Sequence, residues 1–301
     1  MVQLSRASTA MIWLGDAGSH DPRIVGPKAA HLSRLSEDFP VPPGFCMSAD
    51  LFRQEGMGGR LSPLLRAYVA DAYGRLADIS GVAEPRVAVR SSAVDEDGPL
   101  ASFAGQHETL LNIVGTDTLV DAIEQAWSSA RTEQALAYRR RHKLEVDDIG
   151  LAVLVQRLVV SDVAGVMFSA NPINGRRDEM VISASWGLGE SIVGGTVTPD
   201  NWLVLGNSFD ILEERIGEKR VMTVAVEGGT AEVEIPRFMR VQPSLSVGQV
   251  EEVARLGKQL EAIQGWPVDI EFAYAGGKLY LLQCRPITTL NDTPLVVSQA
   301  N

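Results

Sequence analysis

Two short apolar runs near the end of the sequence restrict the possible folds more than any other segment. Residues 265–273 and 278–286 flank Gly276-Gly277, and a Gly-Gly pair between two such runs is typical of an antiparallel β-hairpin. Because side chains alternate between the faces of a strand, every second residue should face the same way. On one face we expect Asp269, Glu271 and Ala273 of the first strand and Leu281, Gln283 and Arg285 of the second. If the registers of the two strands match, the pattern predicts two carboxylates, an amide and a guanidinium on one side of the hairpin and apolar residues on the other.

The polar face of this hairpin suits a phosphate ligand with a divalent cation. Mg²⁺ is usually bound by one or two carboxylates together with phosphate oxygens. Arginine binds phosphate through two parallel hydrogen bonds. An ordinary strand pair with a polar, solvated face explains the hairpin equally well, so further residues must decide between the two interpretations.

Composition excludes several classes of protein. The chain has 301 residues, enough for one large domain or two lobes, and a formal net charge of −11. This charge argues against a nucleic-acid surface but not against an anionic ligand, which local cations can bind. The two cysteines, Cys46 and Cys284, indicate neither a disulfide framework nor a zinc site. No run approaches 18 apolar residues, and we expect a cytoplasmic protein.

The order of the patterns predicts an α+β fold, with helices concentrated in the first half and strands in the second. We expect helices from Pro27 onwards and over 61–79, 116–142 and 247–262. We expect strands over 86–92, 151–160, 163–169, 180–186, 201–205 and 221–235. A two-lobed molecule with its ligand between the lobes fits this order.

Two cations and two glycine-rich segments precede the hairpin. Lys28 follows Pro27 in the first turn of a predicted helix, where backbone N–H groups favour an anion. Arg90 lies on the strand 86–92, on the face opposite to Val87 and Val89. A surface lysine and an edge-strand arginine are the alternative interpretations. The glycine-rich segment 187–195 matches neither a Walker loop nor a dinucleotide-binding fingerprint. The glycine-rich segment 101–109 is a weak signal by itself, since most such loops are only turns.

The hairpin, the two earlier cations and the glycine-rich segments all suit phosphoryl transfer. Phosphoryl transfer requires cations on the phosphates and in-line positioning more than it requires covalent chemistry from the protein. Lys28, Arg90 and Arg285 supply cations, Glu271 and Gln283 supply oxygen ligands, and both glycine-rich segments supply backbone donors.

Several longer motifs carry a resemblance to a known family. They are VGPKAAHL (25–32), VPPGF (41–45), VAVRSSA (87–93), ASFAGQHET (101–109), GVMFSANP (165–172), GLGESIVGG (187–195), DIEFA (269–273) and LLQCRPI (281–287). In this order the motifs resemble the N-terminal nucleotide-binding domain of the phosphoenolpyruvate synthase and pyruvate phosphate dikinase family. Rifampin phosphotransferase and phenylphosphate synthase share that domain. The resemblance implies an ATP-grasp fold with an N-terminal lobe over 1–155, a C-terminal lobe over 156–290 and a linker or tail over 291–301.

The resemblance also implies a role for each matching residue. Lys28 and Arg90 would hold the phosphates of ATP, and Arg285 would stabilise the phosphoryl group during transfer. The glycine-rich segment with Ser102, Ala104 and Gly105 would cover the phosphates, with Thr109 nearby. Gln156 would border the adenine and Glu190 the ribose or the interface between lobes. Glu271 and Gln283 would bind Mg²⁺, with Asp269 close by.

The sequence departs from the family pattern at a few positions. Gly26-Pro27-Lys28 stands where the family usually has Gly-Gly-Lys, Gln106-His107 where it has Gln-Gln, and Ser169 where threonine is common. These changes leave the predicted cations and metal ligands in place, and they put only loop details in doubt.

The resemblance covers roughly residues 20–290 and stops short of two domains that full-length members carry. One is a swivelling domain whose histidine accepts phosphate, and the other binds the final acceptor. We therefore expect a Mg-ATP-binding component that passes the β-phosphoryl group to a histidine on a separate swivelling domain or subunit. The products would be AMP and phosphate, and the acceptor pyruvate or a hydroxyl compound. The component is either a separate subunit or a part of a longer protein.

Two other functions remain open at this point. A non-catalytic nucleotide-binding or regulatory protein could keep the same fold, although it would not need the whole set of phosphate-binding residues. An ATP-grasp ligase that forms an acyl phosphate would need a site for a carboxylate substrate, and no motif indicates one.

Overall fold

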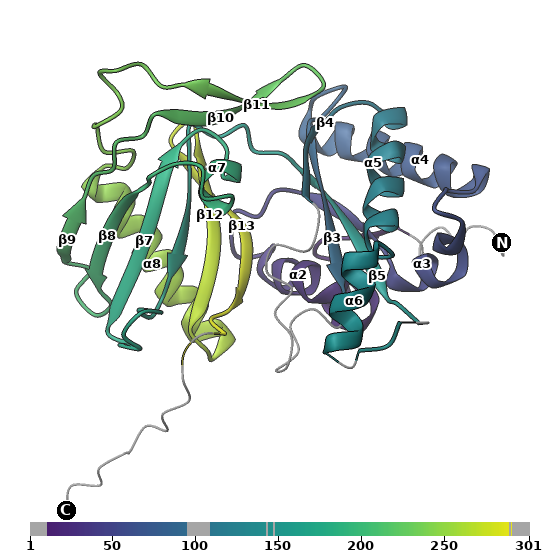
Figure 1. Cartoon of the computed structure of the whole chain (residues 1–301), viewed down its shortest axis with the longest axis horizontal. Coiled ribbons are helices and arrows are strands. Elements are labelled where there is room, and N and C mark those ends of the chain that lie inside the picture. Colours follow the sequence, from purple (N-terminus) through teal and green to yellow (C-terminus); the bar gives the residue numbers. More distant parts are fainter. Residues whose placement is uncertain (1–10, 95–108, 143, 147, 289, 291–301) are drawn as a thin grey trace, which may run out of the picture.

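Two antiparallel sheets organise the molecule (Figure 1). The computed structural model describes residues 11–94, 109–142, 144–146, 148–288 and 290. One sheet has five strands in the order β1-β2-β5-β3-β4, and the other has six in the order β13-β12-β6-β7-β8-β9. We call the parts that carry these sheets the first lobe and the second lobe. The helices and sheets together confirm the predicted α+β class.

The first lobe has one apolar core on the outer face of its sheet. Its strands are β1 (Met11–Trp13), β2 (Gly44–Met47), β3 (Val87–Ala93), β4 (Thr109–Ile113) and β5 (Leu151–Arg157). Its outer helices are α3 (Ala49–Glu55), η2 (Gly56–Gly58), α4 (Pro63–Ser80), α5 (Thr116–Ser129) and α6 (Glu133–Arg141). The short helix η1 (Ala17–His20) lies against the helix over Pro22–Leu35 instead. Val87 and Val89 pack into this core with Trp127 of α5, as their alternation predicts.

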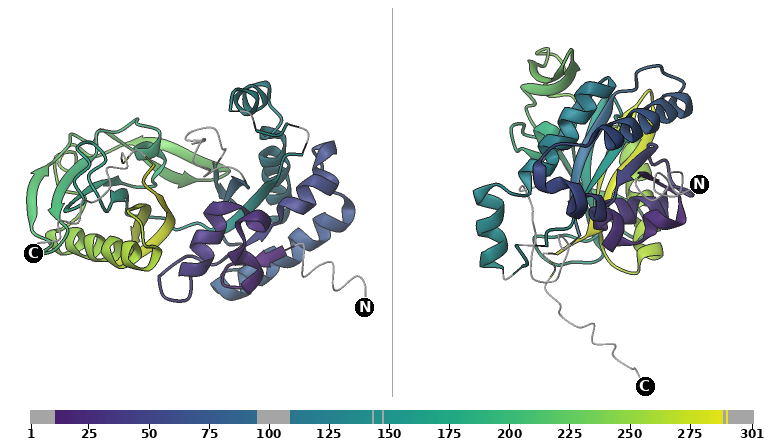
Figure 2. Two further views of the ribbon diagram at one scale, coloured as in Figure 1. Left: turned by 90° about the horizontal axis from the view of Figure 1, so that it is seen from below. Right: turned by 90° about the vertical axis from the view of Figure 1, so that its right-hand side faces the viewer.

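The second lobe packs a long helix against one face of its sheet (Figure 2). Its sheet contains β6 (Val163–Phe168), β7 (Glu179–Trp186), β8 (Asp200–Leu205), β9 (Ile211–Arg215), β12 (Val268–Ala275) and β13 (Lys278–Pro286). Helix α8 (Val247–Gln264) begins with a capping box formed by Ser246 and Gln249. Val250, Val253 and Leu260 of α8 share a core with Ile270 and other sheet residues. The short helix α7 (Glu190–Val193) and the hairpin β10 (Val221–Val226) and β11 (Gly229–Glu234) complete this lobe.

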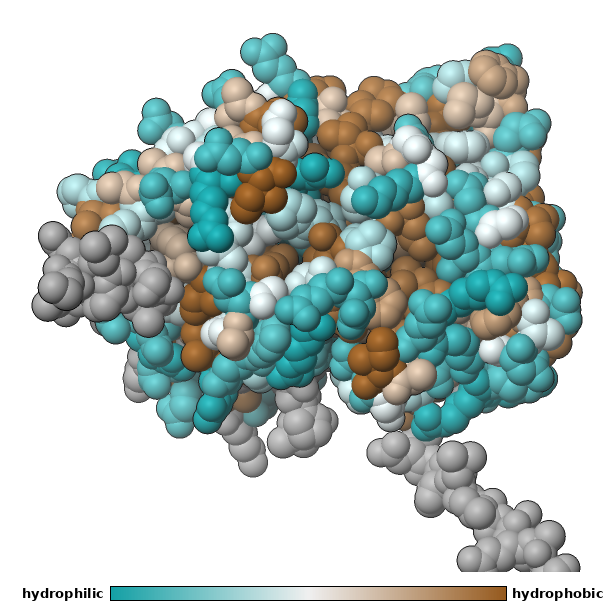
Figure 3. All heavy atoms as spheres, turned by 180° about the vertical axis from the view of Figure 1, so that it is seen from behind, coloured by the Kyte–Doolittle hydropathy of each residue, from teal (hydrophilic) through white to brown (hydrophobic). Residues whose placement is uncertain are grey.

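Helix α2 (Pro22–Leu35) lies between the two lobes. Its Val25, Ala29 and Leu32 belong to the same core as Leu154 of the first sheet and Cys284 of the second. Seen from behind, apolar areas lie along the middle of the molecule, between the lobes (Figure 3). A single helix thus packs against both sheets.

Two expectations about helices need correction. Helix α2 begins at Pro22, and only the segment after a break at Gly26 begins at the predicted Pro27. The helix expected over 116–142 is divided into α5 and α6, because the Thr132 side chain accepts a hydrogen bond from the Ala135 N–H and caps a new helix.

Strands β1, β4 and β9, which the patterns did not predict, are three to five residues long and lie at or near sheet edges. Within the described residues, no helix has the length and apolar character needed to cross a membrane.

A buried ion pair stabilises the back of the second lobe. The side chains of Asp200 and Lys219 are both 0% exposed and are hydrogen bonded to each other. Asp200 also accepts hydrogen bonds from the N–H groups of Gly217, at 2.9 Å, and Ser244, at 2.7 Å. The Ser244 hydroxyl donates to the same carboxylate at 2.7 Å. The pair therefore joins β8, the segment after β9 and the segment before α8.

We predict that Asp200→Ala lowers the free energy of unfolding by about 3–5 kcal/mol, because it leaves the ammonium group of Lys219 buried without its counter-charge. Urea denaturation measures the change. Glu213→Ala is the matched control, since it removes a carboxylate from an exposed ion pair with Arg215 and should cost at most about 1 kcal/mol. Equal losses in the two variants would contradict a structural role for the buried pair.

Candidate functional site

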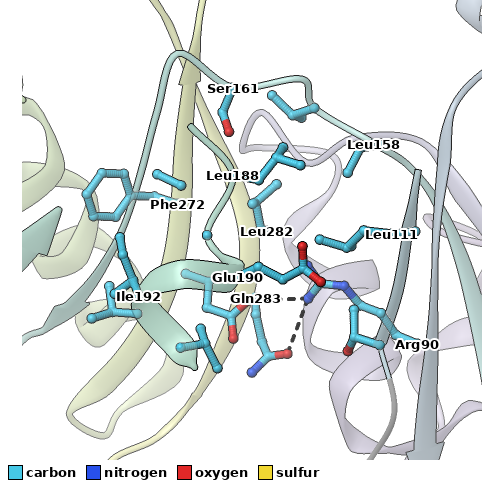
Figure 4. A pocket seen from close by; sticks show the side chains of 18 of the residues that line it. Arg90, Leu111, Leu158, Ser161, Leu188, Glu190, Ile192, Phe272, Leu282 and Gln283 are labelled. Carbon is cyan, nitrogen blue, oxygen red and sulfur yellow. Dashed lines mark hydrogen bonds and ion pairs between the residues drawn. The ribbon is translucent and has the colours of Figure 1, made fainter. Parts of the chain in front are cut away.

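A cavity of about 660 Å³ lies between the two lobes (Figure 4). The residues predicted from the sequence that line it are Lys28, Arg90, Thr109, Gln156, Glu190, Glu271, Gln283 and Arg285. They come from α2, β3, β4, β5, α7, β12 and β13, so the fold brings together residues that are up to 257 positions apart, since 285 − 28 = 257. The predicted residues Ser102, Ala104 and Gly105 lie outside the described part of the chain. The roles assigned to all these residues stay predictions.

A close contact between α2 and β3 brings the two cations of the first lobe to the same wall. Gly26 has a φ of +75°, and a Cβ atom at this position would lie 2.1 Å from Ser92 Oγ and 2.6 Å from Ser92 O. Only glycine avoids both the strained backbone and this clash. The contact lies two residues from Lys28 along α2 and two residues from Arg90 along β3, and both cations line the cavity.

The polar face of the hairpin forms the opposite wall of the cavity. Asp269 lies opposite Arg285, and Glu271 lies opposite Gln283. Arg90 reaches across from β3, and its Nη1 atom lies 3.4 Å from both Glu271 Oε2 and Gln283 Oε1 (Figure 4). The two oxygens therefore converge on one point in the cavity.

Among the described residues, the Arg90 side chain has few other polar partners. Its side chain is only 12% exposed, and its Nε is buried with no hydrogen-bond partner among the described residues. A buried donor without a partner costs free energy unless a ligand supplies an acceptor. The guanidinium therefore suits an anionic ligand bound between the lobes.

A β-bulge changes one part of the predicted hairpin. The register shifts after Glu271, so that Phe272 pairs with Leu281 and Leu282 is the extra residue on β13. We expected Leu281 to share the polar face, and this is wrong, because Leu281 lies in the core beneath α8 with Cys284. Leu282 and Gln283 both line the cavity instead.

Asp269 has a different setting from Glu271. Its Oδ2 accepts a hydrogen bond from Arg285 Nε at 2.8 Å, and the residue is 7% exposed. Burial raises the pKa of Asp269 above its ordinary value, and the charge of Arg285 offsets part of this increase. Asp269 is thus placed to orient Arg285, whose side chain is 39% exposed and lines the cavity.

The other part of the cavity is apolar. Leu111, Leu158, Leu188 and Leu282 project into it from four different segments (Figure 4). Gln156, 2% exposed, borders this part and donates a hydrogen bond from Nε2 to Pro42 O at 3.2 Å. These leucines were not predicted, because nothing in a sequence separates a leucine that lines a cavity from one in a core.

The glycine-rich segment 187–195 forms one edge of the cavity, with α7 inside it. Its first residue, Gly187, has a φ of +82°, and a Cβ atom there would lie 2.4 Å from Thr223 O. The next N–H, from Leu188, donates a hydrogen bond to the same oxygen at 2.8 Å. This contact fixes the segment so that Glu190 faces the cavity (Figure 4).

Comparison with known proteins identifies the family. The family described as "Pyruvate phosphate dikinase, AMP/ATP-binding domain" matches residues 53–299 of the chain. The chain belongs to this family. It is an ATP-binding domain of the phosphoenolpyruvate synthase-like dikinases, and its two lobes form the predicted α+β ATP-grasp fold.

Curated relatives extend beyond this domain. The chain is 37% identical to a probable phosphoenolpyruvate synthase of Methanocaldococcus jannaschii over 92% of its own length and 26% of the relative's. It is 35% identical to a rifampicin phosphotransferase of Streptomyces sviceus, over 92% of its own length and 36% of the relative's. Among solved structures, the ATP complex of D-alanine–D-alanine ligase from Bacillus anthracis aligns with 91% of this chain and 58% of the ligase chain, at 9% identity and a TM-score of 0.35. The chain thus spans roughly a quarter to a third of the two curated relatives.

We predict that Gly26→Ala weakens ATP binding by the ATP-binding domain and lowers stability by about 1–3 kcal/mol, because the new Cβ separates α2 from β3 and strains the backbone. Calorimetric titration and thermal unfolding measure the two effects. Gly74→Ala is the matched control. It lies within α4 with open space around its Cβ position, and should raise stability by about 0.5–1 kcal/mol. Unchanged ATP affinity in Gly26→Ala would show that this contact does not position the site.

Proposed function

We propose that this chain is the Mg-ATP-binding component of a dikinase-type phosphotransferase. It passes the β-phosphoryl group of ATP to a histidine on a separate swivelling domain or subunit, and the reaction gives AMP and phosphate. The observation that carries the proposal is the convergence of Arg90 from one lobe with Glu271 and Gln283 from the other. An arginine beside two oxygen ligands provides for both parts of a metal–phosphate complex.

The two parts of the cavity suit the two parts of ATP. The apolar part, with Leu158 and Leu282, accepts the adenine, with Gln156 at its border. The polar part, with Lys28, Arg90 and Arg285, accepts the triphosphate. Thr109 lies on β4 at the same wall, and Glu190 borders the ribose.

Glu271 and Gln283 are the proposed ligands of Mg²⁺. Their oxygens lie on neighbouring strands and converge within 3.4 Å of the same nitrogen, which suits a small hard cation. Among the described residues, no three His, Cys, Asp or Glu side chains cluster closely enough to hold a metal by themselves. This fits a magnesium site that is completed by phosphate oxygens. Asp269 lies next to this pair and is bonded to Arg285.

The transfer itself relies on the cations. Bound Mg²⁺ neutralises charge on the phosphates. Lys28 and Arg90 hold the phosphate oxygens in place, and Arg285, oriented by Asp269, stabilises the group that moves. The final acceptor is pyruvate or a hydroxyl compound, as the names of the relatives indicate for those proteins.

A non-catalytic nucleotide-binding protein is the second candidate. It would need a cavity for ATP but not Arg285 beside the phosphates, and the Asp269–Arg285 pair favours catalysis for that reason. An ATP-grasp ligase would also bind ATP but would release ADP.

Calorimetric titration of the chain with ATP, with and without Mg²⁺, tests the binding part of the proposal. We expect binding that Mg²⁺ strengthens. Addition of a histidine-bearing swivelling domain then tests the transfer. AMP and phosphohistidine support the proposal, ADP indicates a ligase, and ATP binding without transfer indicates a non-catalytic protein.

Glu271→Gln should weaken Mg-dependent ATP binding by about tenfold or more, because an amide replaces the charged ligand of a hard cation. Binding measured without Mg²⁺ should change much less. Glu37→Gln, at an exposed position in the first lobe, is the charge-matched control. An unchanged Mg²⁺ dependence in Glu271→Gln would exclude this carboxylate as a metal ligand.

Arg285→Ala should lower the rate of histidine phosphorylation roughly a hundredfold while changing ATP affinity much less, because its contact forms with charge that develops during transfer. The rate and the affinity are measured separately, and Arg177→Ala supplies an exposed arginine control. If both quantities fall by the same factor, Arg285 is a binding residue only.

A further inference from the structure

The hairpin of β10 and β11, residues 221–234, extends from the second lobe over the cleft to the first (Figure 1). We call it the interlobe hairpin. Thr223 is the only buried residue of its two strands, and none of their residues belongs to the three apolar cores. Few apolar contacts hold it, so its position depends on a small number of polar ones.

One of these polar contacts joins the interlobe hairpin to the edge of the cavity. Thr223 O accepts the hydrogen bond from Leu188 N–H at 2.8 Å, next to Gly187, where a Cβ atom would clash with the same oxygen. Leu188 and Glu190 of the same glycine-rich segment line the cavity. Movement of the hairpin would therefore move this edge.

The other contact is made by the tip of the interlobe hairpin and Asn112 of β4. The amide Nδ2 of Asn112 donates to Val226 O at 2.6 Å and also to Gly229 O. Its Oδ1 accepts from Arg86 Nη1 at 2.5 Å, which leaves the NH₂ group for the hairpin. Asn112 is 2% exposed, so its amide is shielded from water and bonds to the groups at the interface between the lobes.

The backbone conformation at Asn112 is one that asparagine adopts readily. Its φ of +60° is in the left-handed region, which asparagine tolerates better than most residues. Leu111, next to it on β4, and Thr109, three residues before Asn112, line the cavity. The contact with Asn112 thus joins the first-lobe wall of the cavity to the interlobe hairpin.

We infer that the interlobe hairpin holds the two walls of the cavity together and that Asn112 is the positioning residue that fastens it. Nucleotide leaves when the tip detaches from Asn112 and the glycine-rich segment moves with the hairpin. The inference rests on the proposed binding of ATP in this cavity, and it adds a residue that controls how long the nucleotide stays.

The test compares Asn112→Asp with wild type. Aspartate keeps the shape, the tolerance of positive φ and the partner Arg86, but its carboxylate faces two carbonyl oxygens and cannot donate to them. Stopped-flow displacement of a fluorescent ATP analogue, with Mg²⁺ present, should show release about tenfold faster, since two hydrogen bonds are lost. Asn207→Asp, in an exposed turn, makes the same chemical change and should leave the rate as in wild type.

Hydrogen exchange on the wild-type chain is the second measurement and needs no variant to fold. Amides of residues 222–230 should exchange several-fold more slowly once ATP is added. If wild type binds ATP but Asn112→Asp releases it at the same rate as Asn207→Asp, the inference about the hairpin is wrong, while the proposed function stands. Unchanged exchange of the hairpin amides upon ATP binding would overturn the inference too. Failure of wild type to bind ATP at all would overturn the proposed function, and the inference with it.

Discussion

The packing of α2 against both sheets is the contact on which the cavity depends. The inner face of α2 fills one core with Leu154 of the first sheet and Cys284 of the second, and the N–H of Leu281 donates to Pro40 O just beyond the helix. Two separate sheets would otherwise have no fixed distance between them. The break at Gly26 turns the second segment of α2 against Ser92, so that the same helix also supplies Lys28 to the cavity. Helix α2 therefore both stabilises the packing of the two lobes and positions a cation of the site.

Away from α2, two polar contacts join the lobes across the cleft. The inner contact is Arg90 with Glu271 and Gln283, and the outer contact is Asn112 with the interlobe hairpin. Both are polar links between lobes, and each can be made or broken without exposing an apolar core. Packing at α2 with polar links elsewhere suits a cleft that must admit and release a large anionic ligand. In the second lobe, by contrast, the Asp200–Lys219 pair is fully buried and holds the segments behind the sheet in one arrangement.

Local rules predicted the elements whose sequence contains their own signals. The Gly276-Gly277 turn, the alternation in β3 and the helix over 247–262 were all visible as spacing or turn chemistry. One error occurred where pairing between strands decides, since no local pattern shows that Leu282 forms a bulge that turns Leu281 into the core. The division of the long helical stretch at Thr132 is by contrast a local cap on Ala135, which helical periodicity alone does not reveal. Asn112 and the cavity-lining leucines gave no signal, because their roles depend on segments distant in the chain, as the pairing of Asn112 with Val226 illustrates.

The sequence by itself determined the class of the fold, the family and the chemical types gathered at the site, because periodicity, turn residues and ordered motifs are local properties. It also determined the register next to the turn, as far as Phe272 opposite Leu281, whereas the bulge at Leu282 places Glu271 opposite Gln283. Only the tertiary structure decided that Lys28 and Arg90 meet these residues across a cleft, that Asp269 is bonded to Arg285, and that Asn112 fastens the interlobe hairpin. These are distances between segments far apart in the chain, and the packing of α2 and the two sheets sets them.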